Sequence, residues 1–353
     1  MLDTILDSTL SQWLRHDTDA TDHIVISSRI RLARNFDGLL FTNRNDTSAL
    51  EKVNAISRGL LQPLKEADGH QYSNISLEQL SQSERAVLVE KHLMSPALEE
   101  KLPYRNLVVS DDASIVIMVN EEDHLRIQSM ASGLQLKQAY DHAVQIDKAI
   151  EAKHPYAFDE RFGYLTACPT NVGTGLRASV MLHLPALTMS GRITRLIRSI
   201  IQLGYSVRGL YGEGSEALGA IYQISNQRTM GISEEETIEQ LTKIVEGIIA
   251  EERKARQSLL HNDKEGLEDV LWRSYGVLQY ARRVNGKEAL RKLSDIQLGV
   301  DLDILPPWGN DTFNELVAIT RPNFLTKYLG NEDLTEADRD SYRAKVIRQK
   351  LSK

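Results

Sequence analysis

Residues 107–119 read LVVSDDASIVIMV, in which two apolar runs flank the polar turn Ser110-Asp111-Asp112. Short runs rich in β-branched residues and bounded by turn residues are typical of strands. Helical patterns at 124–151 and 190–203 lie between such runs. We therefore predict an α+β fold with helices packed on a mainly antiparallel sheet, and the pattern also admits parallel order. Further runs of this kind lie at 23–35, 164–167, 178–184, 205–211 and 220–224.

Helical periodicity dominates the rest of the chain, and the PPWG segment at 306–309 interrupts it. A segment rich in polar residues, 261–264, indicates a domain boundary nearby. We predict an N-terminal helical segment at 1–22, an α+β domain at 23–255 and a helical domain at 256–353. The predicted helices lie at 3–16, 48–66, 76–94 (with Ser76 as N-cap), 234–262, 265–283, 286–294 and 335–351.

The composition excludes several classes of protein. Of 353 residues, 41% are hydrophobic and 26% are charged, which is enough to fill a core and excludes dominant disorder. The net charge of −7 disfavours a general nucleic-acid binder. One cysteine, Cys168, allows no intrachain disulfide and disfavours a cysteine-based metal site. No signal peptide or run of about 18 apolar residues is visible, so we expect a cytoplasmic protein without a membrane segment.

Standard nucleotide and zinc motifs are absent: the chain has no GxxxxGK[ST] loop, no protein-kinase signature and no HExxH. Arginines instead follow strand-like runs. Arg29 and Arg31 are two residues apart in an extended segment and should project from one face. Arginines held close together by a sheet favour a polyphosphate, although each one alone is typical of a surface charge. The others are Arg126, Arg177 and Arg208.

Acidic residues follow two of the same runs. Glu121 and Glu122 come after the run 114–119, and Glu213 follows the run 205–211. Two carboxylates that face one pocket would bind a planar guanidinium and accept its proton. The alternative is a solvated loop edge.

Four stretches, SSRIRLAR (27–34), NEEDHLR (120–126), CPTNVGTGLRASV (168–180) and RGLYGEGSEALGAIYQISNQRTMG (208–231), together resemble the catalytic domain of guanidino-phosphotransferases (phosphagen kinases). The resemblance implies that fold, and transfer of the ATP γ-phosphoryl group to a guanidinium nitrogen. It implies Mg²⁺ held mainly by ATP oxygens and water, with no protein metal site. It also implies catalytic roles for Glu121, Glu122, Glu213 and Cys168. The residues implied for ATP binding are Ser27, Ser28, Arg29, Ile30, Arg31, His92, Arg126, Arg177, Ala178, Ser179, Val180, Met181, Arg208, Gly209, Gly212 and Glu213.

Three departures from the small-molecule enzymes stand out. Only a short segment precedes Ser27, where those enzymes have a helical domain that closes over the substrate; Met181 replaces a usual histidine; and about 90 residues follow the catalytic part. The pattern is similar to the bacterial McsB-type protein-arginine kinases, which implies phosphorylation of arginine side chains in proteins that are marked for stress response and degradation. A free-arginine kinase is the second hypothesis, and a non-catalytic phosphoarginine adaptor is the third.

The tail contains RDSYRA at 339–344, which resembles the phosphoarginine-binding pocket of that branch. The resemblance implies an allosteric role for Arg339, Asp340, Arg343 and Ala344, whereas the pattern alone favours an exposed charged helix. It further implies a homodimer, protein substrates with exposed arginines, an activating zinc-binding partner, a heat-shock repressor and a Clp protease. It implies neither a membrane nor nucleic acid as a direct partner.

Overall fold

The structure is a computed structural model that describes residues 2–15, 23–44, 46–100, 103–211, 217–331 and 334–352. The chain divides into two compact units. The first comprises Met1–Trp13, Ser27–Ser179 and Ser225–Thr242. The second comprises Leu14–Ile26, Val180–Ile224 and Lys243–Lys353.

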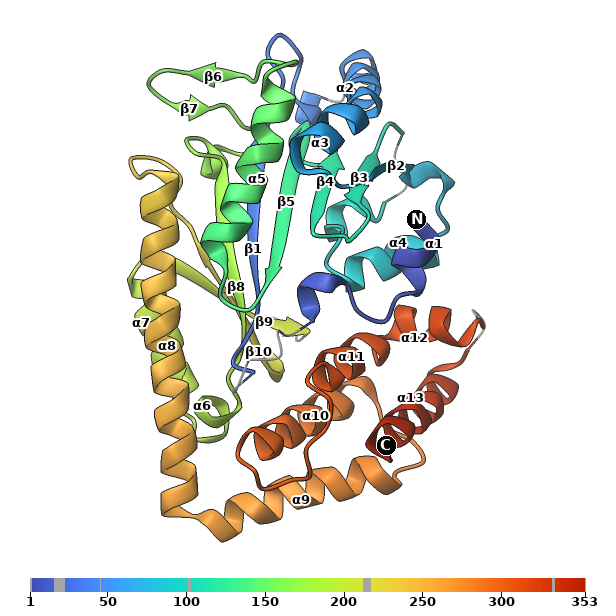
Figure 1. The fold of residues 1–353 in the computed structure, drawn as a ribbon, viewed down its shortest axis with the longest axis vertical. Coiled ribbons are helices and arrows are strands. Elements are labelled where there is room, and N and C mark those ends of the chain that lie inside the picture. The colour runs from blue at the N-terminus through green and yellow to red at the C-terminus, as the bar shows by residue number, and fades with distance from the viewer. Residues whose placement is uncertain are drawn as a thin grey trace. The chain divides into compact units, whose positions relative to one another are not determined.

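Strands form an eight-stranded sheet in the order β2-β3-β4-β5-β1-β8-β10-β9 (Figure 1). The pairs β2–β3, β3–β4, β4–β5 and β1–β5 are antiparallel. The predicted α+β class with a mainly antiparallel sheet is therefore confirmed. The strands are β1 Val25–Arg34, β2 Tyr72–Ser76, β3 Asn106–Ser110, β4 Ile115–Val119, β5 Leu125–Ser132, β8 Leu176–His183, β9 Tyr205–Tyr211 and β10 Ala217–Asn226, with a separate two-stranded ribbon of β6 Phe158–Asp159 and β7 Gly163–Tyr164.

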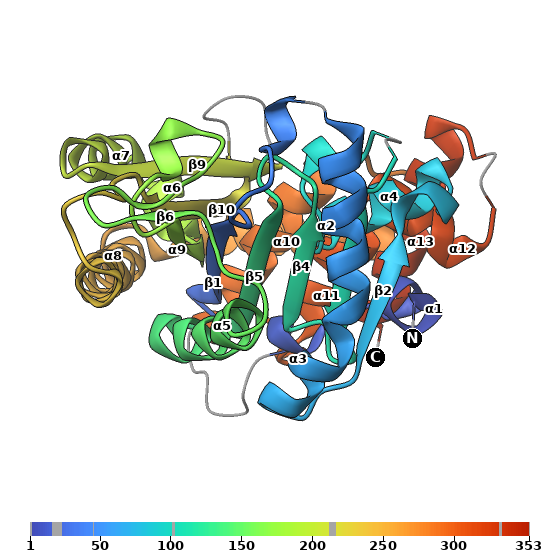
Figure 2. The same cartoon turned by 90° about the horizontal axis from the view of Figure 1, so that it is seen from above.

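Helix α5 (Leu136–Glu151) covers one face of the first unit's strands. It packs on β5 and lies beside α3, as Figure 2 shows from above. Its apolar positions 136, 139, 143, 146 and 150 are buried at helical spacing. The other helices of this unit are α1 Leu2–Asp7, α2 Thr47–Gly59, α3 Leu61–Asp68 and α4 Gln82–Glu90, with 3₁₀ turns η1 Gln12–Leu14, η2 Thr42–Arg44, η3 Leu77–Gln79, η4 Pro96–Leu98 and η5 Pro169–Asn171.

Two helix predictions were wrong in this unit. The segment 124–151 begins with strand β5 before α5, because Leu125 and residues 127–130 are buried in the middle of the sheet and the polar residues of this segment still fit a helical period. The helix predicted at 76–94 starts only after Ser81, which forms a capping box with Glu84. Ser76 ends β2 and is the N-cap of the short 3₁₀ helix η3 (Leu77–Gln79), without a side-chain capping hydrogen bond.

Smaller differences concern the ends of elements. Leu60 separates α2 from α3, so the predicted helix 48–66 is two helices. The predicted helix at 3–16 is α1 followed by η1. Of the predicted strand 164–167, only Tyr164 lies in the short strand β7.

The helices after residue 243 form the core of the second unit, where α9 packs on α10 and α13 (orange to red in Figure 1). Leu271, Leu278, Leu293 and Ile347 are fully buried there. The predicted helices from 234 onward are confirmed, and α11 and α12 are additional. The bounds are α6 Pro185–Met189, α7 Ile193–Gln202, α8 Glu234–Asn262 (whose start lies in the first unit), α9 Lys264–Tyr280, α10 Gly286–Asp301, α11 Thr312–Ile319, α12 Pro322–Leu329 and α13 Glu336–Leu351. None of the described helices combines the length and apolarity that crossing a membrane requires.

Candidate active site

The central strands place three of the predicted arginines on one face of the sheet. In the β1–β5 register, Arg31 lies opposite Gln128 and Ala33 lies opposite Arg126. Side chains alternate along a strand and paired residues share a face, so Arg29, Arg31 and Arg126 project together. Helix α5 packs on the other face, because Arg34, one of the intervening residues of β1, pairs with Asp147 of that helix.

Strand β8 adds a fourth arginine to this face. Arg29 Nε donates a hydrogen bond to Ser179 Oγ at 3.3 Å, which fixes the facing side of β8. Arg177 lies two residues before Ser179 and therefore projects the same way. Its Nη2 donates to Ser225 Oγ of β10 at 3.1 Å. The structure thus brings four of the predicted phosphate-binding arginines together.

Repulsion between these arginines contributes to lowering the pKa of two of them. Burial, followed by the positive charges of Arg177 and Arg126, lowers the pKa of Arg29 to about 10. Burial and the same neighbours, with Arg29, also lower the pKa of Arg31. The Arg31 Nε is buried and has no hydrogen-bond partner among the described residues. Such a concentration of buried guanidinium groups fits a polyphosphate, whose oxygens accept bidentate hydrogen bonds.

The acidic pair lies at the edge of the same face. Arg126 Nη1 lies 2.5 Å from Glu121 Oε2, and its Nη2 lies 2.9 Å from Glu122 Oε2. Glu121 is buried and also accepts a hydrogen bond from Ser95 Oγ at 2.7 Å. The Glu122 side chain is 42% exposed. Glu121 is therefore held in place, whereas Glu122 is accessible to an incoming guanidinium.

Several predicted ATP-binding residues have buried side chains instead. Ser28 Oγ donates to Gly133 O at 2.8 Å and accepts from Gln135 N at 2.9 Å, which orders the entry to α5. Such side chains stabilise the strands that carry the arginines, and only their backbones remain for a ligand. The buried set is Ser27, Ser28, Ile30, Ala178, Ser179, Val180 and Met181.

His92 follows α4 and lies against the arginine face. Its carbonyl accepts a hydrogen bond from Gln128 Nε2 at 2.9 Å, and its ring meets Trp13 edge-on with centroids 6.3 Å apart. The backbone φ of His92 is 60°, a left-handed conformation that is unfavourable for a non-glycine residue. The structure therefore places His92 beside the strand that carries Arg126.

Cys168 lies on a loop whose start is fixed by a buried carboxylate. Asp123 Oδ1 accepts hydrogen bonds from Ala167 N at 2.6 Å and Asn35 Nδ2 at 2.7 Å. Asn35 Nδ2 also donates to Leu165 O at 3.0 Å. Burial raises the pKa of Asp123. The Cys168 Sγ, which is partly exposed, lies 3.0 Å from Thr170 Oγ1.

Arg34 fixes the far end of this loop, a role that sequence analysis missed. Its Nη2 pairs with Asp147 Oδ2 at 2.8 Å, and its Nη1 donates to Thr174 O at 3.0 Å. The guanidinium also lies 3.6 Å from the centre of the Tyr164 ring. The alternation of side chains along β1 indicates this separate role, because Arg34 lies an odd number of residues from Arg29 and Arg31 and therefore projects from the other face.

The remaining predicted residues lie elsewhere. Arg208 is exposed and Gly209 partly exposed in β9 of the second unit. Gly212 and Glu213 lie outside the described residues, so the second predicted acid stays a prediction.

Helix α13 carries the predicted phosphoarginine-binding residues. Arg343 is buried: Nε donates to Thr320 O at 3.0 Å, Nη1 donates to Val284 O at 2.9 Å, and Nη1 also pairs with Asp340 Oδ1 at 2.5 Å. Arg343 therefore holds Asp340 and two neighbouring backbone segments. Arg339 and Asp340 are partly exposed, and Ala344 is buried.

Comparisons with known proteins agree with this arrangement. Residues 52–255 match the family model "ATP:guanido phosphotransferase, C-terminal catalytic domain", and residues 264–353 match "Protein-arginine kinase McsB C-terminal domain". A protein-arginine kinase of Halalkalibacterium halodurans is 46% identical over 99% of this chain and 98% of its own. One from Geobacillus stearothermophilus is 46% identical over 98% and 94%. The crystal structure of a lombricine kinase has a TM-score of 0.57 at 25% identity and covers 72% of this chain and 71% of its own.

The first model spans more than half of the chain and contains the acids, Cys168 and two of the four clustered arginines, Arg126 and Arg177. The second begins directly after α8 and covers the helices that follow. With both matches in succession, and relatives aligned over nearly their whole length, the chain belongs to the ATP:guanido phosphotransferase family, on the branch that carries the McsB C-terminal domain.

Proposed function

We propose that this enzyme transfers the γ-phosphoryl group of ATP to the guanidinium of arginine side chains in proteins. The observation that carries the proposal is the set of four arginines on one sheet face with Glu121 and Glu122 at its edge. Phosphoryl transfer requires alignment and charge neutralisation more than covalent catalysis, and this face supplies both.

Different residues of the chain bind the phosphates and align the acceptor. Arg29, Arg31, Arg126 and Arg177 neutralise the phosphates, and Mg²⁺ bound mainly by ATP oxygens and water adds positive charge. Glu122 aligns the acceptor guanidinium. A guanidinium nitrogen attacks the γ-phosphorus, the bond from that phosphorus to the ADP oxygen breaks, and the departing N–H proton passes to the carboxylate.

Glu122 is bound to Arg126 in this structure. ATP phosphates compete for the same Arg126 guanidinium, so nucleotide binding weakens its hold on Glu122 and favours capture of the acceptor. We propose Glu213 as the second acid and Cys168 as a catalytic residue beside the acceptor cation.

A protein acceptor rather than free arginine is favoured by the relatives, which are named protein-arginine kinases and align with nearly the whole chain. Within that function we propose an N-terminal segment at 1–22, a catalytic domain at 23–255 and a phosphoarginine-binding domain at 256–353. We propose that Arg339, Asp340, Arg343 and Ala344 form the phosphoarginine pocket. Asp340 and Arg339 are the accessible members, and Arg343 positions Asp340.

The cellular context follows from the same resemblance. We propose a cytoplasmic homodimer that phosphorylates exposed arginines and works with an activating zinc-binding partner, a heat-shock repressor and a Clp protease.

A direct assay tests the reaction. The protein is incubated with Mg²⁺ and ATP, and with either free arginine or an unfolded arginine-rich protein, and acid-labile P–N phosphate is measured. We expect phosphate on the protein acceptor. Phosphate on free arginine alone would refute the choice of acceptor, and no product with either acceptor would favour an adaptor.

The tail is tested with Asp340→Ala. We expect changed regulation by added phosphoarginine and an unchanged single-turnover rate of phosphoryl transfer. Complete loss of single-turnover transfer would contradict a role outside the catalytic domain.

A further inference from the structure

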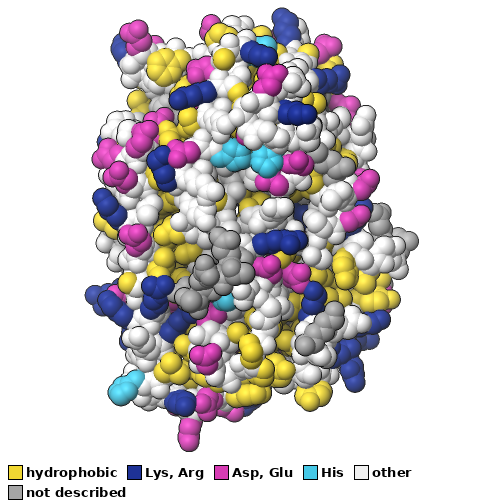
Figure 3. Space-filling view, in the orientation of Figure 1, with side chains coloured by type: hydrophobic (Ala, Val, Ile, Leu, Met, Phe, Trp, Pro, Cys, Tyr) yellow, Lys and Arg dark blue, Asp and Glu magenta, His cyan; other side chains and the backbone are white. Residues whose placement is uncertain are grey.

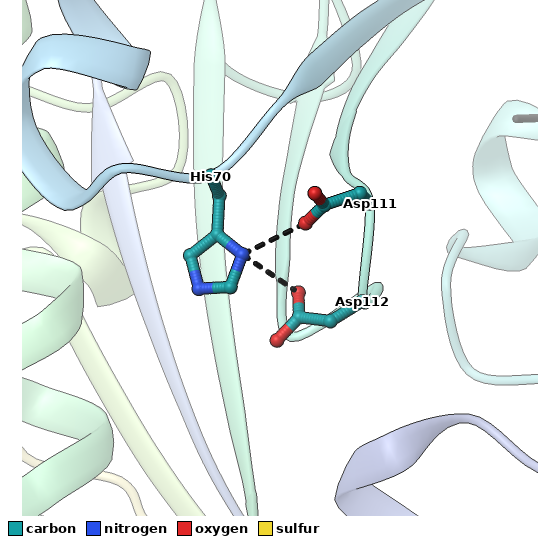
Figure 4. Close-up of side chains that lie close together, drawn as sticks. All are labelled: His70, Asp111 and Asp112. Atoms are coloured by element: carbon teal, nitrogen blue, oxygen red, sulfur yellow. Dashed lines mark hydrogen bonds and ion pairs between the residues drawn. The ribbon is translucent and has the colours of Figure 1, made fainter.

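A second cluster of titratable side chains lies outside the proposed catalytic face. His70 follows α3, and Asp111 and Asp112 form the turn between β3 and β4 (Figure 4). The His70 Nδ1 lies 2.8 Å from Asp111 Oδ1 and 3.9 Å from Asp112 Oδ1. One ligand atom from each residue lies within 4.8 Å of the other two. The pairing of β2 with β3 brings His70 close to the two aspartates, since Tyr72 of β2 lies opposite Ser110 of β3.

The cluster places two carboxylates beside one imidazole nitrogen. An imidazole N–H at Nδ1 donates to one carboxylate, and Asp112 Oδ1 at 3.9 Å is beyond hydrogen-bond distance. A divalent cation, in contrast, is shared among three ligand atoms. In a tetrahedral zinc site with bonds of about 2.0–2.1 Å, ligand atoms lie about 3.3 Å apart. The two measured distances lie on either side of that value, so small side-chain movements complete the geometry.

The two aspartates are held in place by neighbours on the same turn and strand. Asp112 Oδ1 accepts hydrogen bonds from Ser110 Oγ at 2.6 Å, Ser114 N at 3.0 Å and Ser114 Oγ at 2.9 Å. Asp111 Oδ2 accepts from Gln71 N at 3.3 Å. Metal-binding carboxylates are commonly oriented by hydrogen bonds of this kind.

A second histidine and a third aspartate adjoin the cluster from another element. The ring of His142 on α5 lies 6.1 Å from that of His70, between centroids, and its Nε2 lies 3.0 Å from Asp68 Oδ2. Asp68 Oδ1 accepts the backbone N–H of His70 at 3.0 Å. On the face shown in Figure 3, two histidine side chains lie together with acidic side chains beside them. With neutral imidazoles, Asp68, Asp111 and Asp112 give the cluster a charge of −3, which attracts a cation.

We propose that His70, Asp111 and Asp112 form a binding site for a divalent transition-metal cation, of which Zn²⁺ is the type that best suits this donor set. Imidazole with carboxylate favours zinc, whereas Mg²⁺ and Ca²⁺ favour oxygen ligands alone. Water occupies the fourth position, and Asp68 with His142 supports the site from outside. The cation joins the segment after α3 to the β3–β4 turn and stabilises this side of the sheet. Strand β4 separates it from the acids at 121–122, so its role is structural.

The test measures Zn²⁺ binding and thermal stability with the full chain in buffer free of ATP and Mg²⁺. Every protein carries Cys168→Ser, which removes the thiol as a competing ligand. We expect one equivalent of Zn²⁺ to bind at micromolar concentration or tighter, to raise the Tm by several degrees, and to be removed by a chelator. His70→Ala and Asp111→Asn are expected to weaken binding at least tenfold and to abolish the rise in Tm.

His261→Ala is the matched control, because His261 is exposed on α8 and belongs to no described cluster of potential metal ligands. It should bind Zn²⁺ as the parent does. The Tm of each variant without metal shows that it is folded. Equal affinity in the parent, His70→Ala and Asp111→Asn would overturn the proposal, as would a parent that binds no Zn²⁺ at 100-fold excess.

Discussion

The buried carboxylate of Asp123 accepts a hydrogen bond from the backbone N–H of Ala167 at 2.6 Å. This bond joins the segment of Glu121 and Glu122 to the segment that leads to Cys168. Asp123 is fully buried, and its Oδ2 has no hydrogen-bond partner among the described residues. Asp123 thus positions the two segments that it joins, and its own carboxylate does not reach the arginine face.

Two replacements of Asp123 should distinguish the contribution of its negative charge to stability from the contribution of its hydrogen bonds. Asp123→Ala removes the acceptor, leaves the N–H of Ala167 unpaired and removes one of the two hydrogen bonds that Asn35 Nδ2 donates, so we expect a loss of about 2–4 kcal/mol in the free energy of unfolding. Asp123→Asn keeps an acceptor oxygen and removes the cost of a buried charge, so its stability should stay close to that of the parent. Urea denaturation measures both values.

Activity provides the second measurement for Asp123. We expect kcat to fall at least tenfold in Asp123→Ala and much less in Asp123→Asn, with the KM for ATP changed less than threefold in both. If the two variants lost stability and activity equally, the negative charge rather than loop position would be the essential property.

Arg34 and Asp147 should behave as a buried pair. Arg34→Met leaves the Asp147 carboxylate buried without its partner, and we expect a loss of about 3–5 kcal/mol in the free energy of unfolding. Arg34→Lys should recover only part of it, because an ammonium cannot pair in a bidentate manner and also donate to Thr174 O. Arg58→Met is the control, since Arg58 is exposed on α2. A loss below about 1 kcal/mol in Arg34→Met would show that the pair contributes little.

Sequence patterns predicted the fold class and the shared face of Arg29 and Arg31, for different physical reasons. Apolar runs between turn residues indicate strands that are buried in a sheet. The alternation of side chains along a strand indicates that Arg29 and Arg31 lie on one face. Motif resemblance supplied the partner strands, because contacts between β1 and β8 involve residues about 150 positions apart. Pattern alone carries no such long-range information.

The same patterns failed where tertiary contacts decide the role of a residue. Strand β5 retains helical periodicity in its polar residues, and only its place between β4 and β1 makes it a strand. Arg34 belongs to the same motif as Arg29 and alternation places it on the opposite face, but only the structure shows that its partner there is Asp147 of α5. Arg343 resembles a phosphate ligand in sequence but is occupied by backbone carbonyls of two distant segments.

The clustered arginines should reduce stability in the absence of nucleotide. Arg31→Met removes a positive charge that burial and Arg29 disfavour, so the Tm without ATP should be equal to or higher than that of the parent. ATP affinity should fall at least tenfold, because a charge-assisted hydrogen bond contributes about 1.5–3 kcal/mol. Thermal unfolding with and without ATP measures both effects. A variant that is less stable without ATP and still stabilised by ATP would contradict a phosphate-binding role.

Glu122 should be required for transfer but not for nucleotide binding. Glu122→Gln keeps the size of the side chain and removes the charge that aligns the acceptor, so we expect kcat to fall at least about 100-fold. Release of Arg126 from one of its two carboxylates should leave the Kd for ATP within about threefold. Calorimetry and a single-turnover assay measure the two quantities, with the exposed Glu51→Gln as control. A parallel loss of ATP binding would place Glu122 in the nucleotide site.

His124 should make the stability of the protein depend on pH. Its Nδ1 accepts the N–H of Phe36 at 3.0 Å, which requires the neutral ring, whereas its Nε2–H donates to Leu40 O at 2.9 Å in either charge state. Burial lowers the pKa of His124 below its usual value of about 6.5. As the pH falls below about 6.5, the unfolded chain binds a proton that the native state does not, and the free energy of unfolding decreases, by at most about 1.4 kcal/mol per pH unit. His124→Gln should show a smaller decrease between pH 7 and pH 5, measured by urea denaturation. The exposed His261→Gln should retain the parent's slope, and an equal slope in His124→Gln would assign the pH dependence to other groups.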